Sequence, residues 1–249
     1  QTGINLQTGL RKTERIIWKN DEFAKRGQYG AAGPKTCCIF AAGEYGGIDI
    51  GALNGSLIIA ADAGYSELKK RGIKPDLVVG DFDSLGSVPE GVEVIRHPVM
   101  KDETDTQLAI EEGLARGCRR FIIYGALGGR LDHTIANIQL LTRLTNRGAL
   151  GFILGDGVSL TAIRESALRF APGYEGIISV FSAGERAEGV TLKGLKYPLN
   201  EAVLTNDMTL GVSNEFTGAE ALVSVKKGVL LVCWLGNAGL PLPEMDFYQ

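Results

Sequence analysis

Residues 121–148, FIIYGALGGRLDHTIANIQLLTRLTNRG, contain the pattern that decides the fold of this chain. The apolar run Phe121–Tyr124 predicts a buried β-strand, and the glycines after it predict a tight turn. Leu131–Arg147 has apolar residues at helical spacing and stops before Gly148, a frequent helix terminator. A strand that leads through a glycine turn into a helix is the repeating unit of a parallel sheet.

The same alternation of strand and helix continues on both sides of this stretch. Continuous apolar strands that alternate with helices predict an α/β domain with a mostly parallel sheet and helices on both faces. Such sheets bind ligands at the carboxyl ends of their strands. The further strands are predicted at 36–42, 57–61, 76–79, 92–96 and 152–154, and the further helices at 65–71 and 104–116.

The pattern changes after about Asp156. Short apolar segments separated by turn residues follow, without a long helix, which predicts an all-β domain of the sandwich or barrel kind. Its strands are predicted at 159–164, 176–181, 190–192, 210–214, 221–226 and 229–234. We therefore expect an N-terminal extension or expression remnant at 1–34, an α/β domain at 35–156 and a β-rich domain at 157–249.

The composition excludes several classes of protein. The 249 residues carry a net charge of −3, whereas general binders of nucleic acid or anionic membranes are usually basic. No apolar run approaches the roughly 20 residues that span a bilayer. The four cysteines form no C-x-x-C motif and there are two histidines, so neither a zinc site nor a disulfide framework is expected. A reducing, cytoplasmic compartment fits this cysteine usage.

The segment Gly80-Asp81-Phe82-Asp83-Ser84 follows a predicted strand. Residues two apart in extended backbone point to the same side, so Asp81 and Asp83 can aim two carboxylates at one cation. Mg²⁺ suits this arrangement, because it takes a few carboxylates and keeps other positions for water and phosphate oxygens. An Asp-rich turn capped by Ser84 is the competing structural explanation.

The segment Lys101-Asp102-Glu103-Thr104-Asp105 stands at the start of a predicted helix. Asp102 or Thr104 can cap this helix, as part of a capping box. Capping accounts for one or two of these groups and leaves Lys101 and at least one carboxylate unexplained. A helix N-terminus also favours anions, so a phosphate can approach there.

The segment Gly128-Gly129-Arg130-Leu131-Asp132-His133 is a glycine turn that leads into a helix. Glycines let backbone amides approach a phosphate closely, and Arg130 offers a forked donor for it. As structural alternatives, Asp132 can cap the helix and His133 can be a hydrogen-bonded structural histidine. Asp62-Ala63-Gly64, another acidic strand end, is a weaker signal of the same kind.

The three acidic clusters together indicate an enzyme that acts on a Mg²⁺-bound nucleotide. The sequence has no G-x-x-x-x-G-K-[ST], no G-x-G-x-x-G after a first strand and no G-x-S-x-G. A Walker-type kinase, a dinucleotide oxidoreductase and a serine hydrolase of the elbow type are therefore not expected.

In their order and spacing these segments resemble the thiamine pyrophosphokinase family, from about Lys35 to the C-terminus. The β-rich half adds the markers LKGLKYPL (192–199) and GVSNEF (211–216). The resemblance implies transfer of pyrophosphate from ATP to the hydroxyl of thiamine, which gives thiamine diphosphate and AMP. It also implies a Mg²⁺ requirement and a homodimer, with the active site between the α/β domain of one subunit and the β-domain of the other.

The resemblance assigns roles residue by residue. Asp81, Asp83 and Asp105 look like the Mg²⁺ ligands. Asp62 and Asp102 look like supporting acids that position water or the attacking hydroxyl. The implied ATP contacts are Lys101, Thr104, Gly128, Gly129, Arg130 and His133, and the implied thiamine contacts are Asp132, Ser213 and Asn214.

Two alternatives remain open at this point. The α/β half also permits a pyrophosphokinase that acts on another hydroxymethyl heterocycle, such as a pterin. A non-catalytic sensor of nucleotide or thiamine is the second alternative, although a sensor need not retain acids at every predicted metal position.

Overall fold

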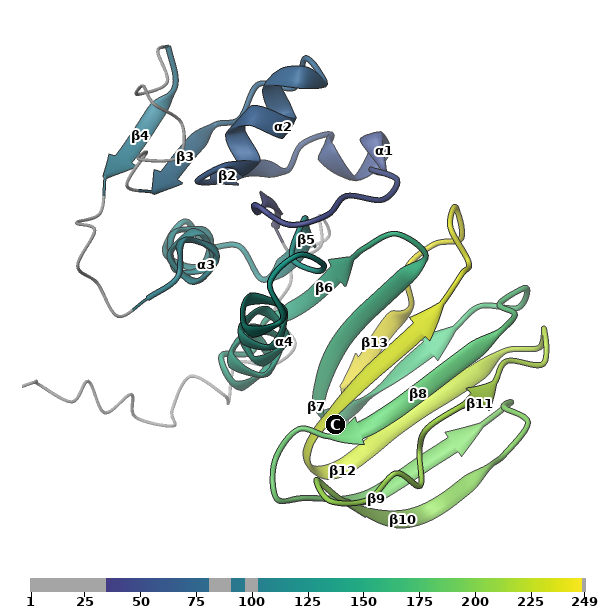
Figure 1. The fold of residues 1–249 in the computed structure, drawn as a ribbon. Helices are drawn as coiled ribbons and strands as arrows, with labels where there is room; N and C mark the ends of the chain where they lie inside the picture. The colour runs from purple at the N-terminus through teal and green to yellow at the C-terminus, as the bar shows by residue number, and fades with distance from the viewer. Residues whose placement is uncertain (1–34, 81–90, 97–102, 248–249) are drawn as a thin grey trace, which may run out of the picture.

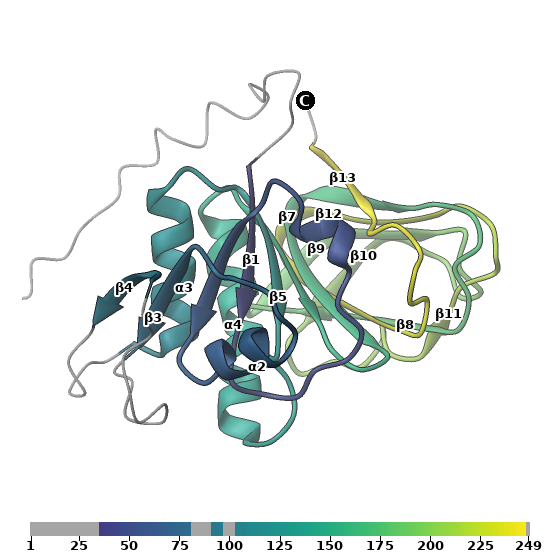
Figure 2. The ribbon, with the colours of Figure 1, turned by 90° about the horizontal axis from the view of Figure 1, so that it is seen from above.

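The computed structural model describes residues 35–80, 91–96 and 103–247. Figures 1 and 2 show an α/β part, coloured purple to teal, beside a strand-rich part in green and yellow. The α/β strands are β1 (Thr36–Phe40), β2 (Leu57–Ala61), β3 (Leu77–Gly80), β4 (Glu93–Arg96), β5 (Arg120–Tyr124) and β6 (Leu150–Leu154). The helices are α1 (Ile50–Leu53), α2 (Gly64–Lys70), α3 (Asp105–Ala115) and α4 (Leu131–Asn146).

The strands of the α/β part form a parallel sheet. Their order is β6-β5-β1-β2-β3-β4, and every neighbouring pair is parallel. The apolar runs predicted all of these strands, and the predicted strand 57–61 coincides with β2. Because the strands run in the same direction, their carboxyl ends lie at one edge of the sheet, where ligand sites form in such folds.

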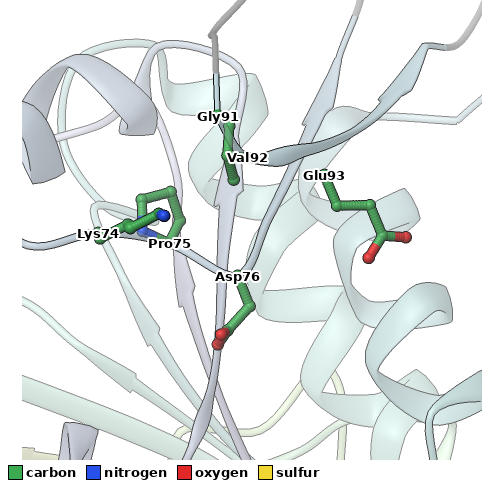
Figure 3. Close-up of a pocket in the computed structure, with 6 residues that line it drawn as sticks. All are labelled: Lys74, Pro75, Asp76, Gly91, Val92 and Glu93. Carbon is green, nitrogen blue, oxygen red and sulfur yellow. The ribbon is translucent and has the colours of Figure 1, made fainter.

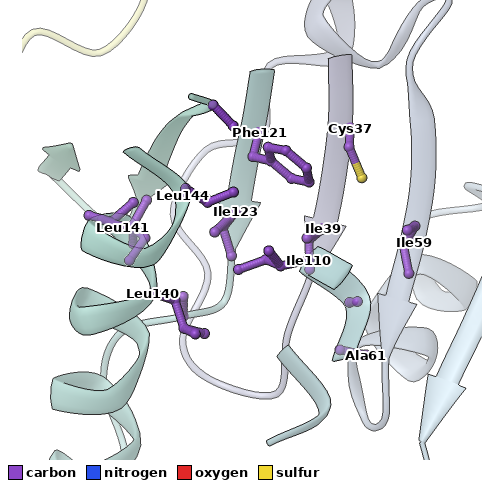
Figure 4. Packing of buried hydrophobic residues seen from close by; sticks show 14 of the residues in the cluster. Cys37, Ile39, Ile59, Ala61, Ile110, Phe121, Ile123, Leu140, Leu141 and Leu144 are labelled. Atoms are coloured by element: carbon purple, nitrogen blue, oxygen red, sulfur yellow. The ribbon is translucent and has the colours of Figure 1, made fainter. Parts of the chain in front are cut away.

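Alternating side chains of this sheet pack into two cores. Cys37 and Ile39 of β1 lie in the core under α3 and α4, which also holds Ile110 and Leu141 (Figure 4). Cys38 and Phe40 lie in the core on the opposite face, against α1 and α2. This two-sided burial explains why the strands read as continuous apolar runs rather than as alternating ones.

The sheet continues beyond the α/β part. β6 pairs in parallel with β5 and antiparallel with β7 (Val158–Phe170), so the mixed sheet runs through both parts of the chain. The turn between β6 and β7 is closed by the Gly155 N–H, which donates to the Val158 carbonyl at 2.8 Å. The predicted boundary near Asp156 therefore falls within a tight turn of one sheet.

The strand-rich part is built on two long strands, β7 and β12 (Ala221–Leu235), which pair antiparallel along their length. The two predicted strands 221–226 and 229–234 are one strand, with an irregular register between Val225 and Val229. The remaining strands are β8 (Ile177–Ser182), β9 (Arg186–Lys193), β10 (Leu199–Thr205), β11 (Asn214–Glu215) and β13 (Glu244–Phe247).

In this half one predicted strand was wrong in part and one strand was missed. Residues 210–213 form a turn instead of the start of a predicted strand, and their apolar side chains Leu210 and Val212 are exposed. The sequence reading also missed β10, which carries polar residues because it is an edge strand that pairs with β9 in the described sheet. The apolar side chains at 210–213 are therefore not buried, whereas β10 is a strand although most of its side chains are not buried.

Candidate active site

The carboxyl edge of the parallel sheet brings three predicted segments together. Asp62 follows β2, Asp105 begins α3, and the segment 128–133 joins β5 to α4. The predicted site residues Asp81, Asp83, Lys101 and Asp102 lie outside the described residues.

Asp62 is fixed by the neighbouring strand. Its N–H donates to the Val79 carbonyl at 2.8 Å, and its backbone has a left-handed φ of 46°. The Cα of Asp62 lies against Gly80, at 3.3 Å from an ideal Cβ built on that glycine. A Cβ on Gly64 would lie 1.9 Å from the Phe40 carbonyl oxygen, so the glycine of this motif allows α2 to start against β1. The half-buried Asp62 is thereby held at the sheet edge.

The start of α3 confirms one of the structural alternatives. Thr104 is the N-cap, and its Oγ1 accepts the Gln107 N–H at 3.2 Å. Asp105 is the first helical residue and is half-buried. Since Thr104 already caps the helix, the Asp105 carboxylate is not needed as a cap. It lies in the first turn, where the helix dipole favours negative charge.

The turn between β5 and α4 needs its glycines. Gly128 and Gly129 have φ values of +79° and +63°, in the left-handed region that glycine adopts without penalty. Behind the turn, the buried Asn137 donates through Nδ2 to the Ala126 carbonyl at 2.8 Å. The turn is therefore anchored to α4 by a side chain inside the protein.

Arg130 and Asp132 form a two-bond ion pair at the start of α4. The Arg130 Nε lies 3.2 Å from Asp132 Oδ1, and Nη2 lies 2.6 Å from Oδ2. Hydrogen bonding to the guanidinium lowers the pKa of Asp132 and raises the pKa of Arg130. Asp132 does not cap the helix, because the N-cap position is Arg130 and no side chain caps it. His133 is exposed, and its N–H donates to Asp132 Oδ1 at 3.0 Å.

One residue at this edge was missed by the sequence reading. Glu44, just beyond β1, accepts the Gly129 N–H through Oε1 at 3.2 Å. Its backbone pairs antiparallel with Leu127, so the segment after β1 lies along the glycine turn. An acidic residue directly after a buried strand was the available signal, but the partner is 85 residues away in the sequence.

The predicted thiamine contacts Ser213 and Asn214 lie in the strand-rich part. Figures 1 and 2 both place β11, which starts at Asn214, far from α3 and α4 within one chain. Ser213 has a φ of 59°, and its N–H donates to Ser179 Oγ at 3.0 Å. The buried Asn214 side chain accepts the N–H of Tyr197 at 3.0 Å and donates to the carbonyl of Tyr197 at 2.7 Å. Asn214 thus holds the loop around Tyr197.

We expect Asn214→Ala to lower the free energy of unfolding by about 1–3 kcal/mol, because truncating the buried Asn214 side chain removes both of its hydrogen bonds to the backbone of Tyr197. Asn214→Asp keeps the acceptor but places a second carboxylate oxygen against the Tyr197 carbonyl, so it should also destabilise. Urea unfolding measures both changes. Asn206→Ala, in an exposed turn, is the control and should stay within about 0.5 kcal/mol of the wild type. An Asn214→Ala variant as stable as this control would refute the structural role.

Neither of two surface hollows coincides with this edge. One, of 320 Å³, is lined by Lys74, Pro75, Asp76, Gly91, Val92 and Glu93, at the amino ends of β3 and β4 (Figure 3). The other, of 640 Å³, lies in the strand-rich part between Gly173 and Leu240. Within the described ranges no three His, Cys, Asp or Glu side chains are grouped to hold a metal ion. Nor is any helix within those ranges long and apolar enough to cross a bilayer.

A parallel sheet whose carboxyl edge carries acids, a glycine turn and a guanidinium is typical of α/β proteins that act on phosphates. Two family models match the chain, the thiamin pyrophosphokinase catalytic domain at residues 52–150 and its vitamin B1 binding domain at residues 166–230. The chain is 31% identical to the thiamine pyrophosphokinase of Bacillus subtilis over 191 aligned residues. This alignment covers 71% of this chain and 86% of that protein.

Solved structures agree with these matches. The crystal structure of the Bacillus subtilis thiamine pyrophosphokinase has a TM-score of 0.72 and 27% identity, and covers 82% of this chain and 100% of that one. The crystal structure of a thiamin pyrophosphokinase family protein from Enterococcus faecalis has a TM-score of 0.70 and 27% identity, and the match covers 82% of this chain and 99% of that one. The chain belongs to the thiamine pyrophosphokinase family.

Proposed function

We propose that this chain transfers the pyrophosphoryl group of ATP to the hydroxyl of thiamine, giving thiamine diphosphate and AMP. The observation that carries the proposal is the shared edge of Asp62, Asp105 and the turn 128–133, in a chain whose two halves match the two domains of one family in order. The match at residues 166–230 to a vitamin B1 binding domain favours thiamine over a pterin as the acceptor.

The reaction forms one bond and breaks one. The thiamine hydroxyl oxygen bonds to the β-phosphorus of ATP, the bond from that phosphorus to the oxygen bridging to the α-phosphate breaks, and AMP leaves with that oxygen. The hydroxyl proton is released. Such transfers depend mainly on positioning and on neutralising phosphate charge.

A divalent cation fits the residues at this edge. Asp62 and Asp105 offer carboxylate oxygens, the hard ligands that Mg²⁺ prefers. Asp81, Asp83 and Asp105 would hold Mg²⁺, which supplies charge neutralisation for the polyphosphate when bound. Asp62 and Asp102 would position water or the hydroxyl. ATP would be bound by Lys101, Thr104, Gly128, Gly129, Arg130 and His133.

A homodimer would complete the site. Asp132 would contact thiamine from the α/β part of one subunit, while Ser213 and Asn214 would come from the β-rich domain of the other. The separation of β11 from the α/β edge within one chain supports this arrangement. Exposed apolar side chains near Ser213, including Leu210 at 54% and Val212 at 39%, also favour cover by a second copy.

In this proposal the chain divides by role. Residues 35–156 would bind ATP and Mg²⁺, and residues 157–249 would bind thiamine. The reaction would take place in the cytoplasm, in keeping with the four free thiols of Cys37, Cys38, Cys118 and Cys233.

Incubation with Mg²⁺, ATP and thiamine, followed by chromatography, tests the proposal. We expect equal amounts of AMP and thiamine diphosphate, loss of both with EDTA, and recovery with excess Mg²⁺. AMP formed only with a pterin acceptor would show that the acceptor is a pterin and not thiamine. ATP binding without AMP from any acceptor would indicate a sensor instead of an enzyme.

A further inference from the structure

The glycine turn after β5 is built around the side chain of Glu44. The Gly43 N–H donates to the Gly125 carbonyl at 2.6 Å, and the Glu44 N–H donates to the Leu127 carbonyl at 2.8 Å. A Cβ on Gly128 would lie 2.3 Å from Glu44 Cδ. These contacts fix the backbone of Glu44 beside the turn and leave room for its carboxylate only because residue 128 is a glycine.

The Tyr45 ring holds the same segment from the other side. A Cβ on Gly125 would lie 2.5 Å from Tyr45 Cζ, and the Tyr45 hydroxyl donates to the Ala41 carbonyl. Glu44 is therefore attached to the sheet edge by neighbours on both sides of its own backbone. The carboxylate is presented to the turn by a packed segment.

Two of the donors predicted for ATP, the Gly129 amide and the Arg130 guanidinium, are already paired with acids of the chain. The Gly129 amide donates to Glu44, and the Arg130 guanidinium pairs with Asp132. Within the described ranges Glu44 forms no ion pair, and its carboxylate accepts the Gly129 N–H. A phosphate oxygen that accepted the Gly129 N–H would take the place of the Glu44 oxygen and would be repelled by the charge of that carboxylate.

We infer that Glu44 lowers the affinity of the glycine turn for phosphate, because its carboxylate accepts the Gly129 N–H that a nucleotide phosphate would otherwise accept. Nucleotide binding then requires the Glu44 carboxylate to leave Gly129. The inference rests on the proposed use of ATP and adds a residue that limits how tightly ATP is held.

Glu44→Gln separates charge from hydrogen bonding, since its amide oxygen still accepts the Gly129 N–H. The probe is the Mg²⁺ complex of α,β-methylene-ATP, which lacks the bond that the reaction breaks, with adenosine as the phosphate-free comparison. Glu103→Gln is the matched control, because it removes one exposed acid near the start of α3 without a contact to the turn. Isothermal titration calorimetry gives Kd for each pair.

We expect Glu44→Gln to bind the analogue about three- to tenfold more tightly, the effect of removing one like charge at about 4 Å in water. The gain should shrink as salt rises. Adenosine binding should not change, and Glu103→Gln should show a smaller gain.

Equal or weaker analogue binding by Glu44→Gln would overturn the inference, as would an equal gain in Glu103→Gln or no binding by either protein. The wild-type protein can also bind the analogue and yet form no thiamine diphosphate. That result would refute the proposed reaction but not the role of Glu44 in phosphate binding.

Discussion

Asp105→Asn should lower kcat by at least about 100-fold while the protein stays folded, if Asp105 is a Mg²⁺ ligand. Replacing the carboxylate with an amide keeps the size of the side chain but removes the charge that attracts the cation. Raising the Mg²⁺ concentration should recover part of the lost activity, because the variant binds the metal more weakly. Steady-state production of AMP across a Mg²⁺ titration measures both effects.

The fold should tolerate this change because Asp105 does not cap α3. Thr104 accepts the Gln107 N–H, so the helix start keeps its cap. The lost attraction between Asp105 and the helix dipole is expected to cost about 0.3–1 kcal/mol. Asp156→Asn, an exposed acid in the turn after β6, is the control and should keep kcat within about twofold. Near-normal activity of Asp105→Asn at low Mg²⁺ would remove Asp105 from the metal site.

The α/β half could be predicted closely because its strands other than β4 are mostly buried on both faces. A run such as Leu57–Ala61 has no polar residue, and glycines mark the ends of α2, α3 and α4. The four-residue helix α1 was missed, since one turn of helix leaves no periodic pattern to detect. Its Asp49 cap, which accepts the Gly51 N–H, was the local signal.

The β-rich half was harder to predict because burial there depends on pairing between distant segments. Leu210 and Val212 have the apolar alternation of a strand but lie in an exposed turn. The polar segment Leu199–Thr205 becomes a strand because β9 offers its edge. An apolar alternation in the sequence therefore predicts a strand only where those apolar side chains are also buried by other segments.

The site shows the same division between local and distant contacts. The cap at Thr104 depends on residues three apart and was among the sequence-based alternatives. The pairing of Arg130 with Asp132 was not foreseen, because it depends on how the glycine turn aims the guanidinium. Glu44 was missed because its contact with Gly129 exists only when β1 and β5 are neighbours.

Arg130→Ala should raise KM for ATP at least about tenfold, since a guanidinium binds phosphate through two charge-assisted hydrogen bonds. Arg130 and Asp132 have side-chain exposures of 73% and 64%, and an exposed ion pair is easily exchanged for a phosphate contact. Arg130→Lys keeps the charge but not the fork, so its KM should lie between those of the wild type and Arg130→Ala. An unchanged KM for ATP in Arg130→Ala would exclude this residue from the nucleotide site.

Variants of Arg130 and Asp132 together distinguish the roles of these two residues. Asp132→Asn should raise KM for thiamine more than KM for ATP, because Asp132 is proposed to contact the acceptor. The guanidinium lowers the pKa of Asp132 in the wild type, so Arg130→Ala should raise that pKa. If thiamine binding needs the carboxylate form, the acid limb of kcat/KM for thiamine should move to higher pH in Arg130→Ala. An acid limb that stays in place would show that the ionisation of Asp132 does not control thiamine use.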